Sequence, residues 1–146
     1  MTEDAGLVVE PLGHPTPDEM AELDALVPQL SASARLPVAW PSIVGVEGTT
    51  VFVARTPDGI VGMLTLVTFT IPTGRRAMIE DVVVDDRARG KGAGLALVNA
   101  ALAVAAEFGA ATVDLTSRPA REAANRLYER AGFVRRETNV WRRVLD

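Results

Sequence analysis

A glycine-rich stretch between two apolar segments is the first feature of this sequence that could do chemistry. Arg89-Gly90-Lys91-Gly92-Ala93-Gly94 follows a valine-rich run that ends at Val84, and it opens the apolar segment 93–108. Glycine lets several backbone N–H groups face one point at the first turn of a helix, where the helix dipole also favours negative charge. The stretch therefore predicts a phosphate-binding turn, with close packing as the alternative reason for its glycines.

Two other phosphate-binding motifs do not match this stretch. A Walker motif requires Gly-Lys-Ser/Thr, whereas Lys91 is followed by Gly92. A dinucleotide fingerprint that starts at Gly92 requires a small residue where the chain has Leu97. Too few residues follow to build the remaining parallel strands of a doubly wound sheet. A nucleotide-binding protein that uses the same turn is therefore the weaker hypothesis.

Glu80 is a candidate base in the strand predicted before the turn. Because side chains alternate along a strand, we expect Glu80 to share a face with Val82 and Val84. A carboxylate among apolar residues is costly to bury unless it is paired, so carboxylates in such positions are often functional. The alternative is that Glu80 lies at the open end of the strand and pairs with Arg75 or Arg76.

Tyr128, the only tyrosine, is a candidate acid. It belongs to the segment 120–131, whose apolar residues recur at helical spacing before Gly132. An aromatic residue on such a stripe commonly packs in the core, which is the alternative to a catalytic role. Trp40 and Phe69 could line a substrate pocket, although core packing is the better interpretation for Phe69.

The composition excludes several other kinds of chemistry. The 146 residues include no cysteine, so a nucleophilic thiol and a thiolate metal cluster are excluded. The only histidine, His14, has no partner pattern, and we expect no metal site. The net charge of −4 argues against nucleic-acid binding. This charge is unevenly divided, because residues 1–74 carry −7 and residues 75–146 carry +3.

The order of the predicted elements indicates a single α/β domain over residues 1–146. We expect a mixed, mostly antiparallel sheet of six or seven strands with helices on both faces. The N-terminal residues lack the basic and apolar regions of a secretory signal, and no apolar segment is long enough to span a bilayer. We therefore expect a cytoplasmic protein that does not bind membranes. The predicted helices cover 17–30, 93–108 and 120–131, and the predicted strands cover 7–9, 51–55, 60–71, 77–84, 111–116, 133–137 and 139–144.

Two motifs together resemble the GNAT superfamily of N-acetyltransferases. The run Ile79-Glu80-Asp81-Val82-Val83-Val84, followed by the turn at 89–94, looks like the family's Arg/Gln-x-x-Gly-x-Gly/Ala cofactor motif after its fourth strand. The stretch Ala124-Asn125-Arg126-Leu127-Tyr128, closed by Gly132-Phe133, resembles its second hallmark helix. Two motifs at this separation are far more specific than either alone. The resemblance is strong from about residue 60 to 144 and weak before it.

The resemblance implies acetyl-CoA as co-substrate and gives the candidate residues their roles. Backbone groups of Val82 and Val84 would pair with the pantetheine arm, and amides of the turn would hold the pyrophosphate. Tyr128 would be the general acid near the thioester sulfur, and Glu80 would accept a proton from the amine, directly or through water. Arg121 stands where many relatives have asparagine, which departs from the family pattern. The implied cofactor-binding residues are Val82, Val83, Val84, Arg89, Gly90, Lys91, Gly92, Ala93, Gly94 and Asn125.

The resemblance further implies direct transfer of an acetyl group to a primary amine in a ternary complex. The acceptor class stays open and includes small molecules and peptides. Homodimers are common among the proteins that the chain resembles. The alternative function is a non-catalytic domain of the same fold that binds or senses acyl-CoA.

Overall fold

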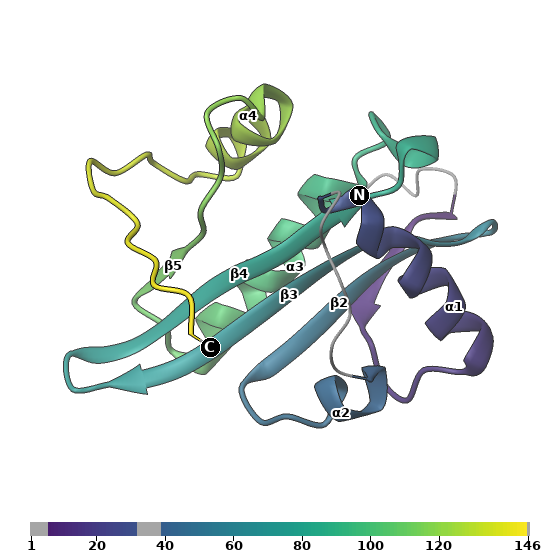
Figure 1. The fold of residues 1–146 in the computed structure, drawn as a ribbon, viewed down its shortest axis with the longest axis horizontal. Helices are drawn as coiled ribbons and strands as arrows, with labels where there is room; N and C mark the ends of the chain where they lie inside the picture. The colour runs from purple at the N-terminus through teal and green to yellow at the C-terminus, as the bar shows by residue number, and fades with distance from the viewer. Residues whose placement is uncertain (1–5, 32–38, 146) are drawn as a thin grey trace. The chain divides into compact units, whose positions relative to one another are not determined.

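The sheet that carries the candidate site has five strands. The structure is a computed structural model that describes residues 6–31 and 39–145. Within these residues the strands lie side by side in chain order (Figure 1). Neighbours from β1 to β4 are antiparallel, whereas β4 and β5 are parallel. The mixed, mostly antiparallel sheet of an α/β fold is thus confirmed. The strands are β1 (Val8–Pro11), β2 (Thr49–Thr56), β3 (Gly59–Ile71), β4 (Gly74–Val84) and β5 (Thr112–Asp114).

Local sequence signals explain where two of the helices begin and end. Helix α1 (Pro17–Leu26) starts with a capping box, in which the Thr16 hydroxyl accepts from the Glu19 N–H at 3.1 Å and the Glu19 carboxylate accepts from the Thr16 N–H at 2.9 Å. Helix α3 (Ala93–Phe108) has the predicted bounds and lies between two glycines with left-handed backbone. The short helices η2 (Val27–Gln29) and α2 (Trp40–Val44) follow α1 along the chain.

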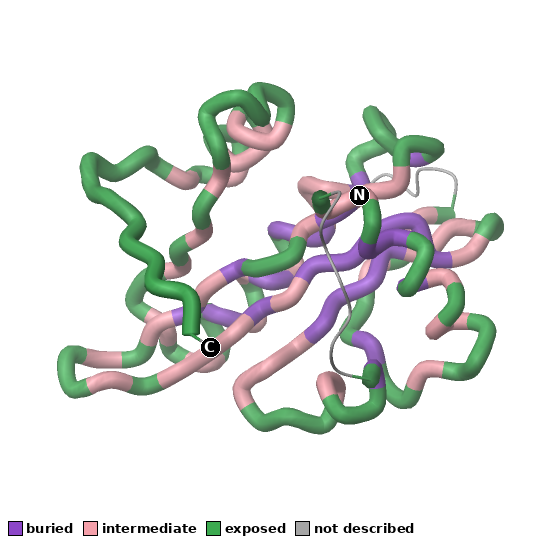
Figure 2. Tube along the Cα trace, viewed as in Figure 1, coloured by how far each residue is buried: buried purple, intermediate pink, exposed green. Residues whose placement is uncertain are grey.

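Helices cover both faces of this sheet. On one face, α1, η2 and α2 pack against β2, β3 and β4 in a hydrophobic core. On the other face lies α3, where a Cβ atom on Gly62 would stand 3.2 Å from Leu97 Cδ1. Buried residues concentrate along the central strands and α3 (Figure 2). The core on the α1 face consists of Leu12, Leu23, Leu26, Val27, Trp40, Val51, Val53, Ile60, Met63 and Val83.

Residues 117–145 belong to a second compact unit, separate in its contacts from the unit that ends at Thr116. Helix α4 (Glu122–Arg130) is the one regular element described in this unit. The prediction of six or seven strands is wrong, because segments 133–137 and 139–144 contain no strand. Their apolar side chains are left in solvent, with Trp141 89% exposed and Val134 83% exposed. Without a covering neighbour, neither ladder hydrogen bonds nor apolar burial offsets the entropy lost in ordering an extended chain.

None of the described helices is long and apolar enough to cross a membrane. The assignment of residues 1–146 to a single domain stays a prediction.

Candidate cofactor-binding and active site

The chain that leaves β4 is held by several contacts before it reaches the glycine-rich turn. The Asp85 N–H donates to the Val61 carbonyl at 2.7 Å, which attaches the end of β4 to β3. The short helix η3 (Asp86–Ala88) follows, and the Gln29 side chain accepts from the Asp86 N–H at 3.3 Å. These contacts fix the position from which the turn projects.

Asp85 caps η3 and pairs with a residue inside it. Its carboxylate accepts from the Arg87 N–H at 3.0 Å and lies 3.1 Å from the Arg87 guanidinium. The backbone hydrogen bond from Arg87, followed by the bond from its side chain, lowers the pKa of Asp85 below its ordinary value. Sequence reasoning missed Asp85 and Gln29. An aspartate directly after a strand is a capping signal that could have identified Asp85.

The turn itself directs free backbone groups outward. Gly90 and Gly92 have left-handed backbone, with φ of 79° and 84°, and a Cβ on either would meet no atom within 4 Å. The open space shows that packing against the protein does not require glycine there. The first intrahelical bond of α3 runs from the Ala96 N–H to the Gly92 carbonyl at 3.0 Å, so the N–H groups of residues 93–95 have no intrahelical acceptor. Amides without an intrahelical acceptor at the start of a helix, next to glycines with free space around them, fit a phosphate group.

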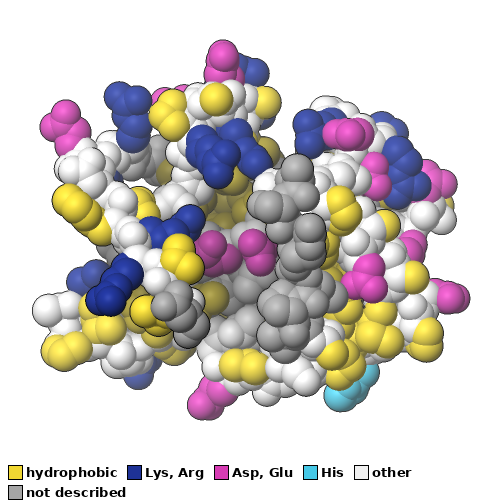
Figure 3. Space-filling model, viewed as in Figure 1, with side chains coloured by type: hydrophobic (Ala, Val, Ile, Leu, Met, Phe, Trp, Pro, Cys, Tyr) yellow, Lys and Arg dark blue, Asp and Glu magenta, His cyan; other side chains and the backbone are white. Residues whose placement is uncertain are grey.

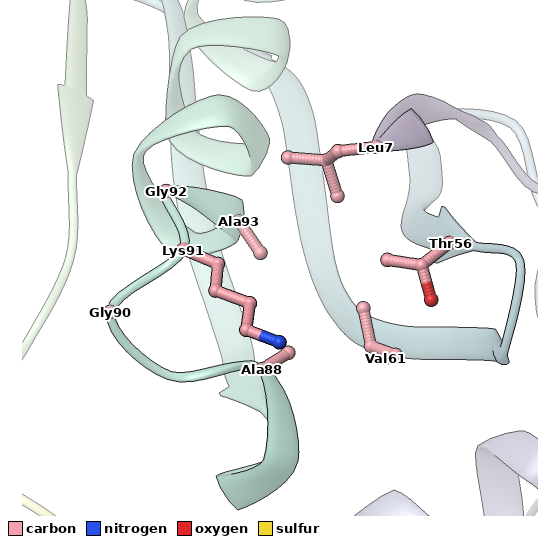
Figure 4. Close-up of a pocket in the computed structure, with 8 residues that line it drawn as sticks. All are labelled: Leu7, Thr56, Val61, Ala88, Gly90, Lys91, Gly92 and Ala93. Carbon is pink, nitrogen blue, oxygen red and sulfur yellow. The ribbon is translucent and has the colours of Figure 1, made fainter. Parts of the chain in front are cut away.

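A cavity of about 380 Å³ lies beside the turn (Figure 4). Its walls are mainly apolar, and Lys91 extends its ammonium group alongside Ala88 into this space. A lysine and the start of α3 both favour an anion here. The cavity is lined by Leu7, Thr56, Val61, Ala88, Gly90, Lys91, Gly92 and Ala93.

The edge of β4 next to the turn lies beyond its ladder with β5. The parallel pairing covers Arg76, Ala77 and Met78 only. In the described part of the first unit, no further strand pairs with β4 on this side from residue 79 to 84. Such an edge can accept an extended ligand as an additional strand. Val82, Val83 and Val84 lie on this stretch, with Val83 buried and the other two half-buried.

The same stretch of β4 contains a β-bulge. Met63 of β3 pairs with Val83, but Thr65, two residues further along, pairs with Glu80, so β4 carries one extra residue. Asp81 lies in the bulge with φ of 51° and is the one non-glycine residue of the described chain with positive φ. This left-handed position in a bulge is commonly occupied by glycine, and it costs about 1 kcal/mol or more for other residues. Aspartate tolerates it better than most.

The bulge corrects the predicted orientation of Glu80. Directly paired residues share a face, so Glu80 lies with Thr65 and Val83 on the face covered by α1. Val84 pairs with Gly62 and faces α3 instead. Glu80 therefore does not share a face with Val84, because the extra residue shifts the alternation. Glu80 is also exposed, so the expected cost of burying its carboxylate does not arise.

Tyr128 is half-buried in the second unit. Its ring meets the ring of Phe133 edge to face, with centroids 6.0 Å apart and an interplanar angle of 67°. The Phe133 N–H donates to the Tyr128 carbonyl at 2.9 Å, which closes the end of α4. Burial raises the pKa of the Tyr128 hydroxyl above its ordinary value, and the positive charge of Arg121 opposes this shift. The hydroxyl therefore keeps its proton at neutral pH.

Two of the other candidate side chains, Asn125 and Trp40, have structural partners. The Asn125 amide donates to the carbonyl of Arg118 at 3.0 Å, so it ties α4 to the preceding loop. Trp40 is buried in the core on the α1 face, where its indole N–H donates to Asp24 at 2.7 Å. Phe69 is half-buried. His14 is exposed, and the cyan histidine lies at the surface in Figure 3.

The fold and the turn define a class of protein. The fourth strand of a mixed sheet carries a bulge and leads into a left-handed glycine turn and a long apolar helix. The family model described as "Acetyltransferase (GNAT) family" matches residues 18–133, and the chain belongs to this family.

Solved structures agree with the family in fold. An acetyltransferase from Trypanosoma brucei has a TM-score of 0.76 at 26% identity, covering 94% of this chain and 99% of that one. A transcriptional regulator from Bacillus halodurans has a TM-score of 0.79 at 26% identity, with the same coverage of 94% and 99%. An aminoglycoside acetyltransferase from an uncultured soil metagenomic sample has a TM-score of 0.83 at 20% identity over 99% of this chain and 100% of that one. No curated protein matches the chain.

Asp85 should contribute stability that depends on pH. Because its folded-state pKa is lowered, its contribution is fully present above the unfolded value of about 3.9 and is lost as the pH falls through the folded value. Asp85→Ala removes the cap and should reduce the free energy of unfolding by about 1 kcal/mol at neutral pH. Asp85→Asn keeps an acceptor for the Arg87 N–H and should cost less. Urea denaturation at about pH 7 and about pH 3 measures both. Equal deficits of Asp85→Ala at the two pH values would contradict this role of the carboxylate.

Proposed function

We propose that this protein is an acetyl-CoA-dependent N-acetyltransferase that moves an acetyl group directly to a primary amine in a ternary complex. The single observation that carries this proposal is the turn after β4, where two left-handed glycines precede the three unpaired amides of α3. This geometry fits a pyrophosphate, and it occurs in a chain that belongs to an acetyltransferase family.

The cofactor would lie along the end of β4 and the start of α3. Acetyl-CoA, when bound, supplies an acyl thioester whose carbonyl carbon is open to attack by an amine. The edge formed by Val82, Val83 and Val84 would hold the pantetheine arm, and the turn from Arg89 to Gly94 would hold the phosphates. Asn125 stays a proposed cofactor contact whose amide already serves the loop before α4.

Two side chains would move the protons that the transfer requires. A primary amine of lysine type has a reference pKa near 10.4 and is mostly ammonium at neutral pH. Glu80 would take the ammonium proton, directly or through water, and the free electron pair on nitrogen could then form the new bond to carbon. Tyr128 would give its proton to the sulfur as the carbon–sulfur bond breaks, and the second proton that the nitrogen loses in forming the amide would restore the Tyr128 hydroxyl through solvent. The Tyr128 hydroxyl, whose pKa burial raises, is protonated at neutral pH, as a proton donor must be.

A second candidate is a domain of the same fold that senses acyl-CoA without turnover. The similarity to a solved transcriptional regulator at 26% identity supports keeping this alternative. Release of CoA thiol from acetyl-CoA in the presence of a panel of primary amines separates the two functions. Turnover with any amine supports the transferase. Tight binding of acetyl-CoA by calorimetry, without thiol release across small amines, polyamines, aminoglycosides and peptides, would favour the sensing domain.

Titrations with ATP and NAD test the remaining hypothesis, a nucleotide-binding protein that uses the same turn.

Gly92→Asp should weaken CoA binding. The change places a side chain and a negative charge where the phosphates are expected, which should cost about 2 kcal/mol or more of binding free energy. Gly74→Asp is the control, because Gly74 also has positive φ and open space around its Cβ position but is the first residue of β4, at the opposite end of that strand from the cofactor turn. Calorimetric titration with CoA compares the two variants. Unchanged affinity in a folded Gly92→Asp protein would remove this turn from the cofactor site.

Glu80→Gln should lower turnover mainly at neutral pH. The substitution keeps the shape of the side chain and removes its charge, and at high pH the free amine is already abundant. The pH–rate profile of thiol release measures the effect, with the exposed Glu107→Gln on α3 as a control for charge alone. A Glu80→Gln profile that parallels the parent at full height would show that another group accepts the proton.

Tyr128→Phe should lower kcat by about 10-fold to 1,000-fold while leaving the fold intact. Phenylalanine keeps the edge-to-face contact with Phe133 and removes only the proton donor. Steady-state thiol release measures kcat, and a thermal melt shows that the variant is folded. Residual activity is expected because a thiolate can leave without a proton. If kcat stays within about twofold of the parent while chemistry is rate-limiting, Tyr128 is a packing residue only.

A further inference from the structure

A row of side chains on β3 and β4 continues beyond the core on the α1 face. Val51 belongs to that core and pairs with Thr65, which in turn pairs with Glu80. Directly paired residues share a face, so all three lie on the α1 face of the sheet. Side chains two residues apart on a strand keep the same face, which extends the row toward the hairpin turn between β3 and β4. We refer to the residues of this row, Val67, Phe69, Arg76, Met78 and Glu80, as the β3–β4 strip.

The middle of the strip is an apolar surface outside the core. Val67 pairs with Met78, and Phe69 pairs with Arg76. Val67, Phe69 and Met78 are half-buried, and none of them belongs to the hydrophobic core that α1, η2 and α2 cover. The hairpin of β3 and β4 extends away from α1 and α2 (Figure 1). An apolar sheet surface beside a candidate base can hold the apolar part of an acceptor.

Opposite charges lie at the two ends of the strip. Glu80 lies at one end, and Asp114 of β5 adds a second carboxylate to the same face where it pairs with Met78. Arg76 lies at the other end, and four residues of extended strand separate its Cα from that of Glu80 by about 13 Å. A ligand that matches both ends must therefore carry its own two charges far apart.

Arg76 has capacity left to bind an anion. Its guanidinium donates to the Thr73 hydroxyl at 3.0 Å, and no carboxylate among the described residues lies within ion-pair distance of it. A guanidinium has five N–H donors in a planar fork that suits a carboxylate. The neighbouring Arg75 differs, because it donates to the Phe108 carbonyl at 3.0 Å and lies over the Phe108 ring. Arg75 thus holds the end of α3, whereas Arg76 faces the strip.

We propose that the acceptor is a small amino acid whose primary amine and carboxylate lie at opposite ends of an apolar body. It binds along the strip, with its amine at Glu80 and its carboxylate at Arg76. This inference rests on the proposed function, because it places the acceptor beside the proposed base. An α-amino acid such as glycine carries both groups on one carbon and cannot reach both ends of the strip. A second positive charge in place of the carboxylate is repelled by Arg76.

The carboxylate of this acceptor positions it and takes no part in the reaction. The amine nitrogen forms a bond to the acetyl carbon as the carbon–sulfur bond breaks. Of the two protons that the ammonium group loses, one ends on the CoA thiol and the other in solvent. The product is an acetamide that keeps its carboxylate at the far end.

Three acceptors with the same apolar chain test the far end of the strip. The ω-amino derivative of octanoate, octylamine and the α,ω-diamine of octane all carry a primary amine, and their far ends are a carboxylate, a methyl group and an ammonium group. Thiol release from acetyl-CoA gives kcat/KM for each acceptor, and calorimetric titration in the presence of CoA gives its affinity. Arg76→Gln removes the charge and keeps a polar side chain. Arg75→Gln is the matched control, because it removes the charge of the arginine that contacts α3.

The order of the three acceptors decides the inference. We expect the parent to use ω-aminooctanoate with a kcat/KM about 10-fold or more above that of octylamine, with the diamine used least. Arg76→Gln should bring ω-aminooctanoate and octylamine within about twofold of each other, whereas Arg75→Gln should keep the parental order. Equal use of these two acceptors by the parent would overturn the proposal without any variant. A preference for the diamine, or a carboxylate preference that persists in folded Arg76→Gln protein, would overturn it as well.

The same measurements distinguish failure of the proposed function from failure of this inference. If the parent acetylates amines without regard to the far group, the transferase function stands and the role of Arg76 is wrong. If the parent releases no thiol with any amine, the proposed activity is wrong, and calorimetry decides the binding site. Binding of ω-aminooctanoate about 10-fold tighter than octylamine, and lost in Arg76→Gln, would then support the strip as a binding site. Equal or absent binding of the two would reject it.

Discussion

The register of β4 against β3 is the constraint on which the candidate site depends. Ala77 and Ile79 on one side of the bulge and Val83 on the other are buried, so neither half of the strand can slide without exposing apolar surface. The additional residue must then be accommodated between them. The strand therefore ends where the Asp85 N–H can reach the Val61 carbonyl, and the turn starts from that point. Core packing in this way sets the place of a surface loop.

The loop divides support and binding between different residues. The segment 85–88, which precedes the turn, is held by backbone and side-chain contacts of Asp85, Arg87 and Gln29. The tip of the loop, from Gly90 to Gly92, has open space in front of it. A phosphate site needs amides whose directions are fixed before the ligand arrives, since ordering them on binding would reduce the affinity. Because segment 85–88 is anchored, Gly90 and Gly92 can supply the left-handed backbone of the turn, and the rigidity of the turn comes from the residues before them.

Helix and turn signals in the sequence predicted much of this architecture. The bounds of α3 follow from apolar periodicity between Gly92 and Gly109, and the start of α1 follows from a Thr16 cap before Pro17. These signals come from residues that are close together in the sequence, so the sequence alone is enough to predict the elements that they define. The turn from Arg89 to Gly94 was identified for the same reason.

Features that depend on non-local pairing were not predicted. The run from Ile79 to Val84 reads as a regular buried strand, because aspartate at position 81 does not mark a bulge in the way that glycine would. The face of Glu80 was therefore assigned wrongly, since the alternation shifts where β3 and β4 pair with unequal numbers of residues. Segments 133–137 and 139–144 have strand-like composition but no strand, because a strand is stabilised by neighbours that composition does not specify. Neither the bulge nor the absence of these strands has a signal within the segment itself.

The contrasting surroundings of the two acid–base candidates support different roles for them. Burial raises the pKa of the Tyr128 hydroxyl, whose ring meets Phe133 edge to face, so this group holds its proton at neutral pH. Glu80, in contrast, is exposed on β4. Pairs of titratable groups in unlike environments commonly divide the work of acid and base. The proposed division of work, with Glu80 as the acceptor and Tyr128 as the donor, follows the order of bond making and bond breaking that acetyl transfer requires.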